Sequence, residues 1–282
     1  MKTVNTIKAV REQVRKWKSQ GLRVAFVPTM GNLHAGHMTL LAKANEIADK
    51  VVASIFVNPL QFGPFEDYDQ YPRTPDADVK KLTANGCELL FLPSVEEMYP
   101  LGKELATTID VPGISDILCG KDRPGHFVGM ATVVSKLLNA VQPDVAIFGQ
   151  KDYQQLMIIR RMVLDLCMPV EIVGAPTNRE SGGLAMSSRN QYLSKEELKI
   201  APLLYATLTA VGDKLKLGER DFSALEKAAR KTLTDTGFKP SYFEIRKALD
   251  LQKPNPDTKS FVVITAAHLG KARLIDNLVV TV

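Results

Sequence analysis

The sequence predicts an α/β protein of two domains: a Rossmann-like parallel sheet in residues 1–177 and a smaller α+β C-terminal domain in residues 178–282. Apolar runs rich in β-branched residues, such as residues 51–57, are typical of strands that a parallel sheet buries on both faces. Amphipathic helical patterns separate these runs, and strand, helix and strand in succession indicate a right-handed βαβ unit. Roughly the last hundred residues change to two helical patterns followed by short strands, which favours a separate unit.

The elements of the first domain follow from the spacing of its apolar residues. A helix is expected directly from the N-terminus, with a stripe over residues 7–17 and an end near Gly21. A further strand is expected at residues 106–111, within a loop-rich stretch. The clearer strands are residues 24–27, 51–57, 88–92, 145–148 and 170–173, and the clearer helices are residues 39–48, 76–85, 130–141 and 156–166.

The second domain follows a polar, glycine-containing link at residues 176–183. Ser194 and Glu197 have the spacing of a capping box, and a helical pattern runs from about residue 195 to residue 217. A second helix is expected at residues 222–236, and strands at residues 242–246, 261–266 and 273–277.

Composition narrows the class of protein. Of the 282 residues, 45% are apolar and 24% charged, which is ordinary for a globular protein. The net charge of +5 is spread out, with no Lys/Arg block that favours a nucleic-acid groove. Cys87, Cys119 and Cys167 have neither disulfide nor zinc spacing, which indicates a reducing compartment. No apolar run reaches the length of a membrane span and no signal peptide is evident, so a cytoplasmic protein without a membrane partner is expected.

The first predicted corner between a strand and a helix carries two histidines. His34-Ala35-Gly36-His37 is an H-x-G-H sequence, and its imidazoles fall three residues apart at the first helical turn. Unpaired N–H groups and the positive dipole end make such a helix N-terminus a phosphate site, and histidines there can hydrogen-bond an anion. The small residues Gly31, Ala35 and Gly36 allow a nucleotide close to the backbone. The structural alternative is that one or both histidines cap the turn.

Two further corners carry polar side chains at the carboxyl ends of expected strands, where α/β sheets bind ligands. Asn58 and Gln61 are neutral amides that suit a substrate with hydroxyls and a carboxylate, although each is also a common turn residue. Lys151 can reach a phosphate, Asp152 can bind ribose hydroxyls or a metal, and Gln155 lies one turn further along the same face.

The link between the predicted domains carries Ser187, Ser188 and Arg189. Hydroxyl and N–H donors with a guanidinium make a good phosphate clamp. The alternative, a helix N-cap, is already supplied by Ser194 and leaves these three residues unexplained.

Arg123 and His126 stand at the entry to the helix at residues 130–141. They form a second candidate anion site or, with equal weight, a helix cap and a surface ion pair. The donors of all these corners suit attack on the α-phosphate of a nucleotide, which needs positioning and charge stabilisation rather than a covalent enzyme intermediate. Mg²⁺ would neutralise the pyrophosphate that leaves, although its ligands are not evident from the sequence.

The H-x-G-H segment resembles the nucleotide-binding motif of the adenylylating α/β-phosphodiesterase superfamily, and the chain from residue 28 to residue 190 resembles the pantothenate synthetase family. The stretches that carry this resemblance are residues 28–37, 56–62, 71–75, 125–127, 148–155 and 186–190. The resemblance implies ATP-dependent condensation of (R)-pantoate with β-alanine through an enzyme-bound pantoyl adenylate, giving pantothenate, AMP and pyrophosphate. It also implies a homodimer with a C-terminal lid.

The resemblance further implies roles for particular residues. His34, His37, Lys151 and Arg189 would be catalytic, with His37 as proton donor. Gln61 and Gln155 would hold pantoate with help from Asn58, and Gln61 would also lie where β-alanine enters. The ATP site would comprise Met30, Gly31, Asn32, Leu33, His34, Ala35, Gly36, His37, Gly149, Gln150, Lys151, Asp152, Asn178, Met186, Ser187, Ser188 and Arg189.

Asn178 departs from the family pattern, which is usually apolar at this position, and a contact through its backbone would tolerate the change. Two other functions remain open from the sequence: a related nucleotidyltransferase with another acceptor, and a non-enzymatic nucleotide sensor. The first would share the histidines but not Asn58, Gln61 and Gln155 together; the second would bind ATP without releasing pyrophosphate.

Overall fold

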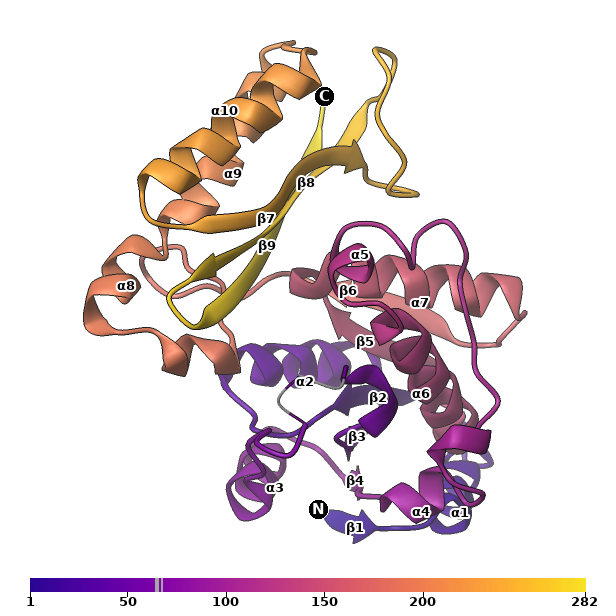
Figure 1. The fold of residues 1–282 in the computed structure, drawn as a ribbon. Coiled ribbons are helices and arrows are strands. Elements are labelled where there is room, and N and C mark those ends of the chain that lie inside the picture. The colour runs from indigo at the N-terminus through magenta and orange to yellow at the C-terminus, as the bar shows by residue number, and fades with distance from the viewer. Residues whose placement is uncertain (64–65, 67) are drawn as a thin grey trace. The chain divides into compact units, whose positions relative to one another are not determined.

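The computed structural model describes residues 1–63, 66 and 68–282, and the chain divides into two compact units (Figure 1). Unit 1 comprises Met1–Gln150 and Ile158–Pro176, and unit 2 comprises Lys151–Met157 and Thr177–Val282. The short segment Lys151–Met157 therefore belongs with the C-terminal part of the chain. The assignment of residues 1–177 to catalysis and of residues 178–282 to a lid stays a prediction.

Unit 1 is built on a parallel sheet whose strand order is β1-β4-β3-β2-β5-β6 among the described residues. The chain moves outward from β2 through β3 to β4 and then returns to place β5 on the other side of β2. Ligands bind beside the carboxyl ends of strands at such a reversal of strand order. The strands are β1 (Lys2–Val4), β2 (Val24–Thr29), β3 (Lys50–Ile55), β4 (Leu89–Phe91), β5 (Val145–Gly149) and β6 (Glu171–Ala175).

Helices cover both faces of this sheet. The helices α2 and α3 pack on one face, and α1 and α6 pack on the other. Because both faces are covered, successive residues such as Phe26 and Val27 are equally inaccessible to solvent. The helices of unit 1 are α1 (Ile7–Lys18), α2 (Ala35–Ile47), η1 (Pro59–Gln61), α3 (Pro75–Ala84), α4 (Val95–Met98), η2 (Lys103–Leu105), α5 (Cys119–Asp122) and α6 (His126–Val141). Two further elements, η3 (Gln150–Asp152) and α7 (Tyr153–Asp165), each have residues in both units.

Unit 2 is a three-stranded antiparallel sheet in the order β7-β8-β9, with the helices α9 and α10 against it (Figure 1). Leu208 and Leu215 of α9 and Leu233 of α10 share a core with Phe243 and Phe261 of the sheet. The elements are η4 (Ser188–Tyr192), α8 (Lys195–Ile200), α9 (Leu203–Lys216), α10 (Phe222–Asp235), β7 (Lys239–Lys247), β8 (Ser260–Leu269) and β9 (Ala272–Thr281). In the part of the chain that is described, no helix has the length and apolar character needed to cross a membrane.

The α/β fold class is confirmed, and three details of the sequence prediction are wrong. The strand β1 precedes the first helix, because Lys2–Val4 pairs with β4. Residues 106–111 form no strand, and the amide of Ile109 donates to the hydroxyl of Thr132 instead. The helix expected from residue 195 to residue 217 is two helices, since Pro202 has no N–H for the helical ladder and its ring obstructs the preceding turn.

Gly129 of α6 provides a test of how closely this helix packs on η1. A β-carbon at Gly129 would lie 2.2 Å from the carbonyl oxygen of Leu60 and 2.7 Å from the amide nitrogen of Gln61. Overpacking of this kind costs about 1–3 kcal/mol. We expect Gly129→Ala to lower the free energy of unfolding by at least that amount in urea denaturation. Gly149→Ala is the matched control, because a β-carbon there meets no atom within 4 Å. Equal stability of the two variants would contradict the close packing.

Candidate active site

The two histidines of the H-x-G-H segment form the start of α2. His34 is the N-cap, and its Nδ1 accepts a hydrogen bond from the amide of Gly36 at 3.1 Å. The Nδ1 of His37 accepts from the amide of His34 at 3.2 Å, which completes a reciprocal capping box. The two rings lie 4.2 Å apart, centroid to centroid, with their planes tilted by 54°. The capping interpretation of these histidines is therefore confirmed.

Capping engages the Nδ1 of each ring and so decides which nitrogen carries the proton. A nitrogen that accepts an N–H carries no proton, so a neutral ring in this arrangement carries its proton on Nε2. The backbone of α2 thus selects the tautomer of both His34 and His37. Both rings lie at the positive end of a 13-residue helix, a position that favours an anion.

The turn that leads into α2 is held by a buried carboxylate. Asp78 of α3 is 1% exposed, and its two oxygens accept the amides of Asn32 and Leu33 at 2.9 and 2.8 Å. The ammonium of Lys81, one turn further along α3, donates to the carbonyl of Leu33 at 2.6 Å. Gly31 adopts a φ of 80°, and a β-carbon there would lie 3.1 Å from the Asp78 carboxylate. The turn therefore needs both the glycine and the aspartate.

Asn58 follows β3 as the N-cap of η1 and is 1% exposed. Its Oδ1 accepts from the hydroxyl of Tyr99 at 2.7 Å and from the amide of Leu60 at 3.3 Å. Its Nδ2 donates to Gln61 Oε1 at 3.2 Å and to the carbonyl of Gly129 at 3.0 Å. Burial raises the pKa of Tyr99, so its hydroxyl remains a donor. These four bonds use the full capacity of the Asn58 amide and orient Gln61.

Gln61 is tied to two other segments of unit 1, the turn before α2 and the start of α6. Its Nε2 donates to the sulfur of Met30 at 3.1 Å, which joins η1 to the H-x-G-H turn. His126 Nδ1 lies 2.8 Å from the carbonyl oxygen of Gln61, and Arg123 Nη1 lies 2.9 Å from His126 Nε2. Because a carbonyl can only accept and a guanidinium can only donate, this ring carries its proton on Nδ1. Arg123 also pairs with both oxygens of Glu66 at 2.6 Å, so the ion-pair interpretation of Arg123 is confirmed.

The corner after β5 falls at the boundary of the two units. Gly149 and Gln150 belong to unit 1, whereas Lys151, Asp152 and Gln155 belong to unit 2. In unit 2, the carbonyl of Lys151 accepts a hydrogen bond from Asn277 Nδ2 at 2.9 Å. The sequence-predicted residues are therefore brought together in two groups. His34, His37, Met30, Asn58 and Gln61 are connected in unit 1, and Lys151 lies in unit 2 with the Ser187–Arg189 loop.

The Ser187–Arg189 loop of unit 2 follows a short hairpin. Asn178 accepts the amide of Met186 through its backbone carbonyl at 2.9 Å. Ser187 is the N-cap of η4, and its hydroxyl accepts the amide of Arg189 at 3.3 Å. The N-cap alternative is thus met by Ser187, while Ser194 caps α8 as the sequence predicted.

Three residues that support these groups were not identified from the sequence. Asp78 follows a Thr-Pro pair in the first turn of its helix, where an acidic residue is ordinarily explained by the helix dipole. Tyr99 and Asn277 contact their partners across 41 and 126 residues of chain. A buried carboxylate and a buried amide each need a partner, but periodicity does not indicate which one.

Comparison with known proteins places the chain in a family. Residues 2–279 match the family model described as pantoate-beta-alanine ligase. The chain belongs to this ligase family. The pantothenate synthetase of Pseudomonas fluorescens is 56% identical over 278 residues, which cover 99% of this chain and 97% of that protein. The pantothenate synthetase of Pseudomonas aeruginosa is 55% identical, with coverage of 99% and 98%.

Solved structures of pantoate-beta-alanine ligases share the fold. The pantothenate synthetase of Thermus thermophilus superposes with a TM-score of 0.91 at 46% identity and covers 99% of both chains. The ligase of Francisella tularensis, complexed with beta-gamma ATP and β-alanine, gives a TM-score of 0.81 at 37% identity, with coverage of 99% and 97%. The resemblance found in the sequence is confirmed, and the chain is an enzyme of the ligase class.

Asp78→Asn tests whether the Asp78 carboxylate holds the turn that leads into α2. An amide can accept only one of the two N–H bonds and turns its NH₂ toward the other donor, which leaves a buried N–H without a partner at a cost of about 1–3 kcal/mol. We expect a loss of that size in urea denaturation, with a fall in ligase activity of the folded fraction. Asp76→Asn is the matched control, because Asp76 is an exposed acid in the same helical turn. If the two variants are equally stable and active, the Asp78 carboxylate does not hold the turn.

The Arg123–Glu66 pair predicts a dependence of stability on pH. Burial alone would raise the pKa of Glu66, but the hydrogen bonds and charge of Arg123 outweigh burial and lower the pKa below its usual 4.5. A carboxyl with a lowered folded-state pKa stabilises the protein above its unfolded-state pKa and loses that contribution as pH falls through the folded-state value. We expect Arg123→Gln to destabilise the protein at neutral pH and the difference from the parent to shrink below pH 4.5.

Urea denaturation of parent and variant from about pH 7 to about pH 3 measures this difference. Arg73→Gln is the control, because the Arg73 guanidinium donates to the backbone carbonyls of Asp69, Tyr71 and Tyr68, which do not titrate. A difference for Arg123→Gln that stays constant with pH would contradict the pairing.

Proposed function

We propose that this chain joins (R)-pantoate to β-alanine through an enzyme-bound pantoyl adenylate. The overall reaction, ATP-dependent formation of pantothenate, is that of the ligase family to which the chain belongs. In the first step, a carboxylate oxygen of pantoate attacks the α-phosphorus of ATP and pyrophosphate leaves. In the second step, the amine of β-alanine attacks the acyl carbon, the bond from that carbon to the AMP oxygen breaks, and the amine loses a proton to solvent.

The observation that carries this proposal is the pair of histidine rings at the N-terminus of α2, each held by a hydrogen bond from a backbone amide to its Nδ1. Charge accumulates on the phosphoryl oxygens as the pentacoordinate arrangement forms, and donors already oriented toward them lower the barrier without reorganising. The capping bonds hold His34 and His37 in that orientation before substrate arrives. We assign His37 the further task of giving a proton to the departing pyrophosphate, for which an imidazole is suited near neutral pH.

The remaining residues are of two kinds: some contact substrate, and others hold the contacting residues in place. We assign Lys151 and Arg189 to the phosphates as fixed positive charges, together with the hydroxyls of Ser187 and Ser188. Gln61 and Gln155 bind pantoate. Asn58 acts through Gln61, because its amide is fully bonded within the protein.

Mg²⁺, a homodimer and a cytoplasmic location complete the proposal. Among the described residues, no group of three His, Cys, Asp or Glu side chains is placed to hold a metal. That fits Mg²⁺, which is bound by one or two carboxylates together with substrate phosphates. Asp152 is the carboxylate we assign to it, and the ion would neutralise charge on the pyrophosphate. The family resemblance supports the homodimer, and sedimentation at several protein concentrations tests it.

His37→Ala tests the chemical step. We expect the parent enzyme to release pyrophosphate from ATP in a single turnover with pantoate alone and continuously once β-alanine is added. Removing an oriented donor to a developing charge lowers the rate by about 100- to 1,000-fold, and we expect that loss in the pantoate-dependent step. His268→Ala is the matched control, because His268 is exposed on β8. ATP binding without pantoate-dependent release in the parent enzyme would contradict the adenylate, and an active His37→Ala would contradict the role of His37.

A further inference from the structure

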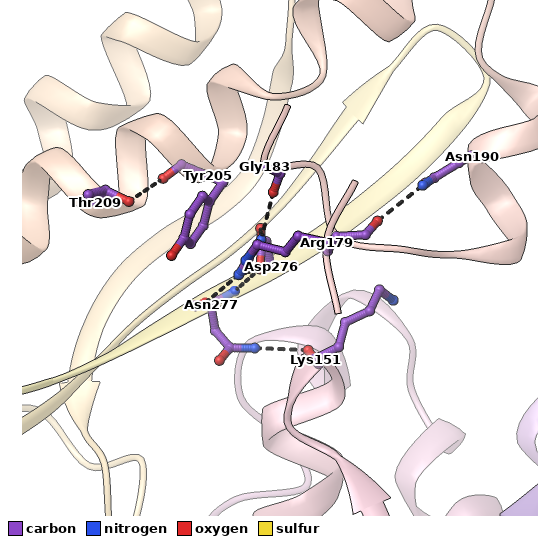
Figure 2. A network of polar contacts seen from close by, with 9 residues as sticks. Lys151, Arg179, Gly183, Asn190, Tyr205, Thr209, Asp276 and Asn277 are labelled. Carbon is purple, nitrogen blue, oxygen red and sulfur yellow. Dashed lines mark hydrogen bonds and ion pairs between the residues drawn. The ribbon is translucent and has the colours of Figure 1, made fainter. Parts of the chain in front are cut away.

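Two adjacent polar residues of β9 lie buried in unit 2. Asp276 is 2% exposed and Asn277 is 6% exposed, and both belong to a network of polar contacts (Figure 2). Successive side chains of a strand point to opposite faces, so neighbours on β9 can reach different segments of chain. Burial of an anionic group and an amide side by side requires that each have a specific partner.

The partner of Asp276 is Arg179, at the start of the hairpin that leads to the Ser187–Arg189 loop. Two guanidinium nitrogens of Arg179 donate to the two carboxylate oxygens at 2.6 and 2.9 Å. The guanidinium also lies over the ring of Tyr205, 3.4 Å from its centroid, and donates to the carbonyl of Gly183 at 3.0 Å. Arg179 begins the hairpin and pairs through its backbone with Ala185 at the other end. Contacts that hold Arg179 therefore hold both ends of the hairpin.

The partner of Asn277 is the backbone of Lys151. Asn277 Nδ2 donates to the Lys151 carbonyl at 2.9 Å, and the backbone amide of Asn277 donates to Asp276 Oδ1 at 2.8 Å (Figure 2). A second bond in unit 2 holds the same segment, since the hydroxyl of Tyr153 donates to the carbonyl of Ala248 at 2.8 Å. The segment that carries Lys151 is thereby fastened to the C-terminal sheet.

We infer that Asp276 and Asn277 are positioning residues that set the distance between Lys151 and the Ser187–Arg189 loop. The inference rests on the proposed function, which assigns both of these groups to the phosphates of ATP. Each group is carried by a separate segment, and each segment is tied to one of two consecutive residues of a single strand. A strand fixes the separation of consecutive residues, so it transmits that separation to the two segments.

Asn277→Ala tests the link to Lys151, with Thr209→Val as the matched control. Thr209 lies in the same unit and loses a comparable bond, from its hydroxyl to the carbonyl of Tyr205 at 3.0 Å. The first measurement is hydrogen–deuterium exchange of peptides that cover residues 150–157. We expect these peptides to exchange faster in Asn277→Ala than in the parent and at the parent's rate in Thr209→Val. Both variants should have the same melting temperature.

Steady-state kinetics then separate positioning from folding. Misplacement of a binding group lowers the rate strongly, and we expect kcat/KM for ATP to fall about tenfold in Asn277→Ala while KM for β-alanine stays unchanged. In a Lys151→Ala background, Asn277→Ala should have a smaller further effect than in the parent, because part of its effect passes through the Lys151 side chain. A fully additive second loss would overturn the inference, as would a uniform loss that follows the amount of folded protein.

Arg179→Lys tests the link between Asp276 and the hairpin before the Ser187–Arg189 loop, because lysine keeps the charge but loses the paired geometry. We expect faster exchange in residues 184–190 but not in residues 150–157, with a raised KM for ATP. Unchanged exchange in both variants would overturn the inference. If exchange rises at residues 150–157 while Lys151→Ala itself leaves KM and kcat unaltered, the hold on the segment stands and the assignment of Lys151 to ATP in the proposed function fails.

Discussion

The backbone N–H groups of the turn after β2 and of the first turn of α2 are the constraint on which the histidine site depends. A turn that enters a helix leaves several amides without partners in strand or helix, and buried amides must find acceptors. Asp78 accepts two of them, and the Nδ1 atoms of His34 and His37 accept two more. The same bonds that allow the helix to begin here therefore fix the orientation and tautomer of both rings. For these histidines, helix capping and chemistry are one arrangement rather than alternatives.

At the corner after β3, two nearby side-chain amides have different roles. Asn58 is saturated by protein partners, whereas Gln61 receives its orientation from Asn58 and from the backbone contact with His126. A buried amide with a wrong or missing partner is costly, so a saturated Asn58 specifies one geometry for its neighbour. The Gln61 contact with Met30 then joins this corner to the histidine turn.

Much of this could be predicted from local sequence, and the remainder could not, for a definite reason. The buried strands and the start of α2 follow from periodicity and from the H-x-G-H spacing, and the break at Pro202 has a local cause that the helical pattern obscured. The three-residue β1 exists only because β4 lies beside it. Asp78, Tyr99 and Asn277 act on residues far away in the chain, and their own surroundings in the sequence contain no sign of those partners.

The ion pair between Arg179 and Asp276 shows why position rather than stability explains the polar core of unit 2. Desolvating two charges costs several kcal/mol per ion, on the order of what their attraction returns, and apolar residues of the same volume often stabilise a fold equally well. Those residues would not fix a register. The guanidinium donates to both Asp276 oxygens, to Gly183 and to Asn277, so only one placement of the hairpin satisfies it. Arg189 lies a few residues beyond that hairpin, so the pair contributes to its placement through the chain.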